Sequence, residues 1–263
     1  MKKELIILLL GFIFQPGFSQ KIIDKNLQTH FAKYNVEGCF VLFNQSDNEY
    51  IRYNALRCDT GYIPASTFKI PNSVISLEEK VIQDANQVIK WNGKEHSRKE
   101  LNQDQTLSSA MKYSCVWVYI GFAEQIGIEN YQAYMDSFNY GNKKLTGPPT
   151  YFWLAGDFKI SANQQVEFLR KFYNYELGVS RKSVDIVKNI IVLEQTDTYK
   201  LCGKTGGGII SDKEDIMWLV GYVEKGNKPY FYAMNFTTSD YAKTMHVRYD
   251  LVKDILKELK LIK

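Results

Sequence analysis

Metal-ligand patterns are missing from this sequence. Only three histidines occur, His30, His96 and His246, and their scattered positions form no HExxH-type spacing, which argues against a zinc hydrolase and predicts no metal site. The net charge of +4 is spread over mixed lysine, arginine, aspartate and glutamate. No basic block of about five or six residues interrupts this mixture, so the charge pattern does not indicate nucleic-acid binding.

Internal repeats, linkers and low-complexity tracts are missing as well. The 263 residues, 45% of them hydrophobic, suffice to bury a substantial core, so we expect one compact unit. After the N-terminus, no apolar run reaches the ~18 residues of a membrane span. A basic start, an apolar run from Leu5 to Phe14 and small residues before Gln20 predict a secretory signal at 1–19, followed by one domain at 20–263.

Cysteine is scarce, with four residues in a chain that we expect to be exported. Export permits a disulfide but does not specify one. Cys115 and Cys202 lie in apolar segments and are predicted to be free, buried thiols. Cys39 with Cys58 is the pair that we consider a disulfide candidate.

Three short motifs occur in a fixed order: Ser66-Thr67-Phe68-Lys69, Ser114-Cys115-Val116 and Lys204-Thr205-Gly206. Each is a weak signal alone, but their order and separation match the penicillin-recognising serine enzymes. Together they supply a hydroxyl nucleophile, a lysine base and a second cation.

The first motif precedes an apolar run at helical spacing, so Ser66 is expected at a helix N-terminus with Lys69 on the same face. A helix N-terminus offers backbone N–H groups to a developing oxyanion, and a serine nucleophile needs a nearby base. A lysine with an ordinary pKa of about 10.4 is protonated at neutral pH, but burial can lower that pKa by about 3–5 units. Phe68, Ile70, Val116 and Trp153 are predicted to bury Lys69. Its neutral amine can accept a proton or react with carbon dioxide.

A plainer interpretation exists for the first two motifs. Ser66 and Lys69 also fit an N-cap serine followed by a solvated helix lysine. Ser114 precedes an apolar stretch that predicts a buried helix, and it is expected to cap that helix. Capping is compatible with a role in relaying a proton.

The third motif ends a predicted strand, and its glycines allow a substrate to approach the backbone closely. Lys204 and Thr205 are predicted to bind an anion. A phosphate-binding P-loop would need a glycine five residues before Gly203, where Thr198 stands, so a nucleotide site is excluded.

At these residues the chain resembles the class D (oxacillinase-type) serine β-lactamases, from about Glu37 to the C-terminus. Tyr140-Gly141-Asn142 resembles their tyrosine-glycine-asparagine motif, and the segment 152–156 resembles the tryptophan segment that follows it. The segment 165–170 is similar to the next helix of the family. Class A enzymes carry serine-aspartate-asparagine in the second motif, so Ser114-Cys115-Val116 argues against them.

The resemblance implies a mechanism. Lys69 would be N-carboxylated from carbon dioxide or bicarbonate, with no other cofactor, and its carbamate would accept a hydrogen bond from Trp153 and act as general base. Ser66 would attack the lactam carbonyl, with the oxyanion between its own N–H and that of Gly207. Ser114 would pass a proton to the lactam nitrogen.

The resemblance also implies the residues that line the substrate site. The substrate carboxylate would meet Lys204, Thr205 and Arg248, although Arg248 also fits a surface arginine on an amphipathic helix. The remaining residues would screen the carbamate or shape the pocket: Val116, Leu154, Tyr140, Asn142 and Gly206. One departure is Gly207, where many relatives carry a larger side chain.

The coarse element pattern agrees with the α/β fold of this family, a central antiparallel sheet flanked by terminal helices with a mostly helical subdomain. We expect helices at 22–34 and 246–261, a hairpin of 38–43 with 49–53, and a mostly helical middle from Ser66 to Ile191. Strands are expected at 199–204, 217–223 and 230–236.

The predicted function is class D β-lactamase activity on penicillin-type antibiotics, in a protein exported to the periplasm of a Gram-negative bacterium. The predicted partner is the small-molecule substrate, without nucleic acid and without a membrane span in the mature protein. Two alternatives share the motifs. One is a β-lactam sensor domain that stays acylated, and the other is a penicillin-binding D,D-peptidase.

Overall fold

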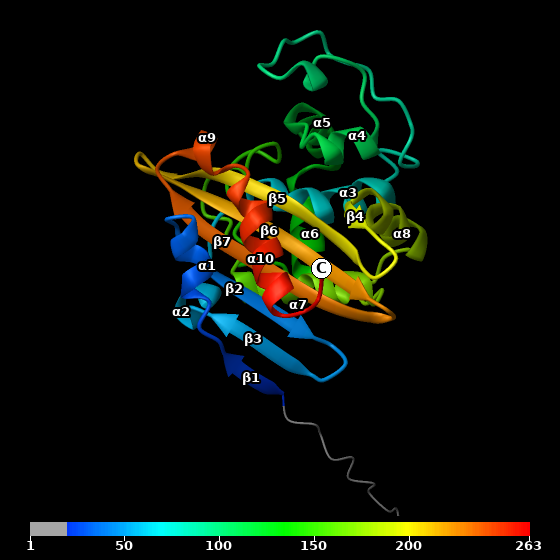
Figure 1. Ribbon diagram of the computed structural model, residues 1–263. Helices are drawn as coiled ribbons and strands as arrows, with labels where there is room; N and C mark the ends of the chain where they lie inside the picture. Colours follow the sequence, from blue (N-terminus) through cyan, green and yellow to red (C-terminus); the bar gives the residue numbers. More distant parts are fainter. Residues whose placement is uncertain (1–19) are drawn as a thin grey trace, which may run out of the picture.

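The computed structural model describes residues 20–263, so the predicted signal at 1–19 lies outside the described residues. A seven-stranded sheet forms the centre of the molecule, in the order β1-β3-β2-β7-β6-β5-β4 (Figure 1). Its strands are β1 (Lys21–Asp24), β2 (Glu37–Asn44), β3 (Glu49–Tyr53), β4 (Val192–Gln195), β5 (Lys200–Ser211), β6 (Glu214–Lys225) and β7 (Lys228–Thr238).

Helices occupy both faces of this sheet and most of the middle of the chain. They are α1 (Gln28–Lys33), α2 (Ala55–Asp59), η1 (Ala65–Phe68), α3 (Lys69–Glu78), η2 (Lys99–Leu101), α4 (Leu107–Lys112), α5 (Val116–Ile126), α6 (Ile128–Phe138), α7 (Ala162–Tyr173), α8 (Arg181–Ile190), α9 (Tyr241–Thr244) and α10 (Val247–Glu258). None of the helices in 20–263 is long and apolar enough to cross a membrane. The central sheet with helices on both faces confirms the predicted fold class.

Strand β2 shows why the sheet is covered on both sides. Cys39, Val41 and Phe43 belong to a large apolar cluster with α3 and α5 to α8, whereas Phe40 and Leu42 belong to a smaller cluster with α1 and α10. Successive side chains of a strand point to opposite faces, so a strand that is apolar throughout needs cover on both. Figure 1 shows α1 and α10 on one face and α7 on the other.

The predicted hairpin is confirmed, because β2 and β3 pair antiparallel with Asn44 opposite Glu49. The three later strands are also confirmed, although each is longer than predicted. The predicted helix at 22–34 is wrong in its first half. There Ile22 lies opposite Tyr50 as β1 pairs in parallel with the edge strand β3, so a tertiary backbone partner overrides the local pattern.

All four cysteines are buried free thiols. The prediction for Cys115 and Cys202 is confirmed, but the candidate disulfide between Cys39 and Cys58 is not formed. The Cys58 thiol instead points at the carbonyls of Phe40 and Tyr53, at 3.5 and 3.4 Å.

The sheet meets the first helical turn of the middle segment along β5. A Cβ at Gly206 would lie 2.9 Å from Thr67 Cγ2 and 3.0 Å from the Pro64 carbonyl oxygen. The Trp218 indole N–H, from the neighbouring strand β6, donates to the Ile63 carbonyl at 3.1 Å. Glycine in β5 thus lets residues 63–68 approach the sheet, and this contact brings the first and third motifs together.

The pairing of β5 with β6 requires glycine at position 221. A Cβ there would lie 2.0 Å from the Cys202 carbonyl oxygen, which is backbone and cannot yield. We predict that Gly221→Ala lowers the free energy of unfolding by about 3 kcal/mol or more, measured by urea denaturation with circular dichroism. Gly121→Ala is the matched control: nothing lies within 4 Å of its Cβ in α5, and it should stabilise by up to about 1 kcal/mol. Equal stabilities of the two variants would contradict the pairing.

Candidate active site

Ser66 lies in η1, one helical turn from the first residue of α3. The Lys69 Nζ donates to Ser66 Oγ at 3.0 Å, as their i and i+3 positions predict. Ala65 has a φ of 47°, a left-handed conformation that few non-glycine residues adopt. Its N–H donates to the Trp153 carbonyl at 2.9 Å, which fixes the turn that presents Ser66.

Lys69 is buried, with only 1% of its surface exposed. Burial lowers the pKa of Lys69 to about 7, and the positive charge of Arg98 contributes in the same direction, whereas Cys115 opposes it. The Tyr119 ring lies 5.0 Å from Nζ and contributes a cation–π contact. The lowered pKa makes the neutral amine of Lys69 accessible near neutral pH, as a base requires.

Trp153 is buried beside this pair and stacks on Phe68, with the ring centroids 5.6 Å apart. Its indole Nε1 has no hydrogen-bond partner. A buried donor of this kind costs free energy unless something accepts its proton. These surroundings fit a carbamate on Lys69. The pocket is apolar, the amine of Lys69 can be neutral, and the free indole N–H can donate to a carbamate oxygen.

Ser114 lies between α4 and α5 with a φ of 54°. Its predicted N-cap role is wrong, because Cys115 is the N-cap residue of α5 and makes no side-chain capping bond. The left-handed turn, with the Ser114 N–H donating to the Met111 carbonyl at 3.2 Å, starts α5 one residue later than a serine cap requires. The Ser114 hydroxyl is thus not used in capping that helix.

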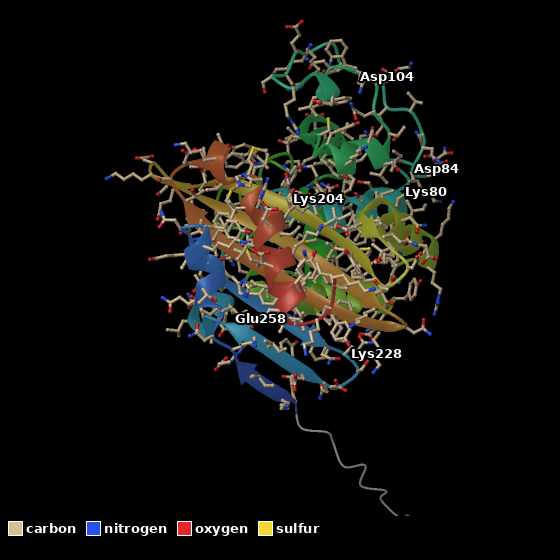
Figure 2. All side chains as sticks on the ribbon, in the orientation of Figure 1. Lys80, Asp84, Asp104, Lys204, Lys228 and Glu258 are labelled. Atoms are coloured by element: carbon tan, nitrogen blue, oxygen red, sulfur yellow. The ribbon has the colours of Figure 1, made fainter. Side chains whose placement is uncertain are left out.

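The third motif places Lys204 on β5, buried, with its Nζ donating to the carbonyl oxygen of Thr205 at 3.0 Å and to its Oγ1 at 3.3 Å. Figure 2 labels Lys204 far from Glu258, an acidic residue of α10. Burial holds the pKa of Lys204 well below its usual value, and the charges of Lys69 and Arg248 lower it further.

Arg248, the second residue of α10, is also buried. Its Nη1 donates to the Gly206 carbonyl at 3.0 Å and its Nε to the Met245 carbonyl at 2.9 Å. Among residues 20–263, no carboxylate forms an ion pair with Lys69, Lys204 or Arg248. Three buried basic side chains without an acid form a site for an anionic ligand.

The other predicted site residues differ in their surroundings. Val116 is the first residue of α5 and Leu154 follows Trp153, both half-buried. Tyr140 is inside the core, where its hydroxyl donates to Gln165 Oε1 at 3.5 Å. Asn142 braces a loop through bonds to the Asp157 carbonyl and the Lys159 N–H.

Three residues near the site escape the sequence analysis as site residues. Gln165 Nε2 donates to Thr67 Oγ1 at 2.9 Å, beneath the nucleophile. Tyr119, in an apolar helix, has the same pattern as a simple core residue. Arg98 Nη2 donates to the Tyr113 carbonyl at 2.6 Å, next to Ser114, but it comes from an irregular segment without a motif. Only Tyr119 carries a usable signal, since its helix directly follows the second motif.

Comparison with known proteins identifies the family of this chain. The penicillin binding protein transpeptidase domain matches residues 31–257. "Beta-lactamase OXA-48" of Klebsiella pneumoniae is 39% identical over 91% of this chain and 89% of its own length. This chain belongs to the class D β-lactamase family. A class D β-lactamase from Nostoc has a TM-score of 0.87 at 33% identity, covering 90% of this chain and 99% of the Nostoc chain.

The family also includes sensors. The C-terminal domain of the Bacillus licheniformis BlaR penicillin receptor has a TM-score of 0.89 at 32% identity, covering 95% of this chain and 100% of that domain. The regulatory protein BlaR1 of the same organism is 35% identical over 84% of this chain, which spans 36% of BlaR1.

In residues 20–263, no group of histidine, cysteine or acidic residues is placed to hold a metal.

The positive charge of Arg98 affects the pKa of Lys69, which can be measured by titration. Because Arg98 disfavours the protonated amine, we predict that Arg98→Gln raises the pKa of Lys69 from about 7 and leaves less neutral amine at pH 7. The Cε resonance of ¹³C-labelled lysine reports this pKa directly. Lys228→Gln, which removes the same charge at the start of β7, where Figure 2 labels Lys228, should leave the titration unchanged, and Arg98→Lys should restore it. A Lys69 that titrates identically in Arg98→Gln would contradict the coupling.

Proposed function

We propose that this chain hydrolyses the β-lactam amide of penicillin-type antibiotics through an acyl-enzyme on Ser66. The observation that supports the proposal is the Ser66–Lys69 pair, 3.0 Å apart, facing an anion site of buried cations. A penicillin carries a carboxylate next to its strained amide. Lys204, Thr205 and Arg248 are suited to bind that carboxylate and so orient the amide toward Ser66.

In acylation, Ser66 Oγ bonds to the lactam carbonyl carbon and gives its proton to the base at position 69. The oxyanion lies between the backbone N–H groups of Ser66 and Gly207. When the carbon–nitrogen bond breaks, the Ser114 hydroxyl donates a proton to the nitrogen and regains one from position 69. Water then gives a proton to the base at position 69 as its oxygen bonds to the acyl carbon. The ester bond breaks, and the base passes that proton to Ser66 Oγ.

We propose that Lys69 carries a carbamate, which would supply the general base for acylation and deacylation. Trp153 Nε1, buried without a partner, is the donor available to hold it, and Val116 and Leu154 exclude water from it. Bicarbonate is the only small molecule that the proposed chemistry needs besides substrate and water.

A sensor function has a specific observation in its favour, the similarity to the BlaR penicillin receptor. The two functions share acylation and differ in deacylation, so the same residues fit both. The export of the protein to the periplasm, based on the N-terminal sequence pattern, is part of the hydrolase proposal.

The deciding experiment mixes the protein with a chromogenic cephalosporin, with and without bicarbonate, and follows the Ser66 adduct by mass spectrometry. We predict a transient adduct and turnover that increases with bicarbonate. Ser66→Ala should abolish both, whereas Ser46→Ala, in an exposed turn, should keep both. A persistent adduct without turnover would contradict the hydrolase and favour the sensor or the D,D-peptidase.

The carbamate has its own test. In ¹³C-bicarbonate, we predict a carbamate resonance that disappears in Lys69→Ala and weakens in Trp153→Phe. A hydrogen bond to a buried charge contributes about 1.5–3 kcal/mol, so the bicarbonate needed for half occupancy should rise by about 10- to 100-fold in Trp153→Phe. Trp91→Phe, in an exposed loop segment, is the matched control. If carbamate occupancy is unchanged in Trp153→Phe, the proposed hydrogen bond from the indole to the carbamate is contradicted.

A further inference from the structure

Gly207 is the residue whose N–H is assigned to the oxyanion, and it carries no side chain. The space beside it is nevertheless filled. A Cβ at Gly207 would lie 2.6 Å from Tyr241 Cε2, 2.8 Å from its hydroxyl and 3.1 Å from its Cζ. The neighbouring Gly206 and Gly208 face Thr67 and Ile63 instead, as strand alternation requires. The aromatic ring of Tyr241, from α9, therefore covers the backbone of β5 at Gly207.

Tyr241 is held in this position by its own short helix. It is the first residue of α9, where the Asp240 side chain accepts from the Lys243 N–H at 3.1 Å. Thr244 Oγ1 donates back to the Asp240 carbonyl at 2.8 Å. Figure 1 shows α9 beside the end of β5, at the edge of the sheet nearest the helical part.

The Tyr241 ring has no structural role in the core. It belongs to neither apolar cluster, and 37% of its surface is exposed. Its hydroxyl interacts with the Arg248 guanidinium, where it opposes the effect of burial on the Arg248 pKa. The ring thus lies next to two parts of the site, the Gly207 backbone and Arg248, and remains partly exposed.

We infer that Tyr241 is a specificity-determining residue, which supplies from α9 the aromatic wall that β5 lacks at Gly207. The inference rests on the proposed acylation of Ser66. A substrate acylated there lies along β5 with its carbonyl oxygen at the Gly207 N–H, so its substituents meet the free side of the ring. Aromatic rings favour offset or edge contacts with other rings, which selects β-lactams that carry an aryl substituent.

The test measures the rate constant of Ser66 acylation by rapid-quench mass spectrometry, for a penicillin with an aryl side chain and for one without a side chain. Tyr241→Ala should lower the ratio of the two rate constants by about three- to tenfold. Tyr241→Phe keeps the ring and should keep the ratio. An unchanged ratio in Tyr241→Ala would overturn the inference.

A double-mutant cycle tests the contact itself. Gly207→Ala places a methyl group against the ring and should slow acylation, and adding Tyr241→Ala should recover at least part of the loss. Tyr249→Ala is the matched control: Tyr249 is also 37% exposed but lines the cavity of about 590 Å³ at Lys204, so its effect should add to that of Gly207→Ala. Additive effects of the Gly207 and Tyr241 changes would overturn the wall.

Acylation separates this inference from the proposed hydrolysis. A wild-type adduct that never deacylates would refute the hydrolase and leave the Tyr241 measurements valid. Turnover with an unchanged substrate ratio would refute the wall alone, and a wild-type protein that forms no adduct would refute both. Circular dichroism of each variant identifies a change that acts through folding.

Discussion

The burial of three basic side chains without an acidic partner is the constraint on which this structure depends. Lys69, Lys204 and Arg248 approach one another where β5 meets η1, and no carboxylate in residues 20–263 pairs with them. Burying such charges is costly in free energy, and the protein moderates the cost by shifting lysine pKa values and by bonding Lys204 and Arg248 to backbone carbonyls. What remains is a site suited to an anionic ligand, and under the proposed function that ligand is the carboxylate of a β-lactam.

The aromatic core under the site makes this arrangement rigid. Phe68, between the nucleophile and the base in sequence, contacts the rings of Tyr140, Phe152, Trp153 and Phe158 at centroid distances of 5.1 to 5.9 Å. These rings are contributed by segments that are irregular in secondary structure. They hold η1 from below while β5 holds it from the side, so the left-handed turns at Ala65 and Ser114 persist despite their strain.

An enzyme and a receptor can share every feature described so far, because both need to be acylated. They differ in deacylation, the step in which water attacks the acyl carbon. For the proposed hydrolase, the groups available for that step are Lys69, the Trp153 indole N–H that lacks a partner, and the half-buried Val116 and Leu154. The wall formed by Tyr241 acts earlier, on which substrate is accepted, and so concerns both functions equally.

The sequence by itself determined that Ser66 and Lys69 share one helical face, through their i and i+3 spacing, and that a strand, β5, carries the third motif. It also determined that the sheet is covered on both faces, because the successive residues 39–43 of β2 are all apolar. Tertiary structure decided what depends on partners distant in the chain: the pairing of β1 with β3, the free thiols of Cys39 and Cys58, and the turn at Ser114. It alone brought Tyr241 to Gly207, because a contact between residues far apart in the chain leaves no periodic trace in either segment.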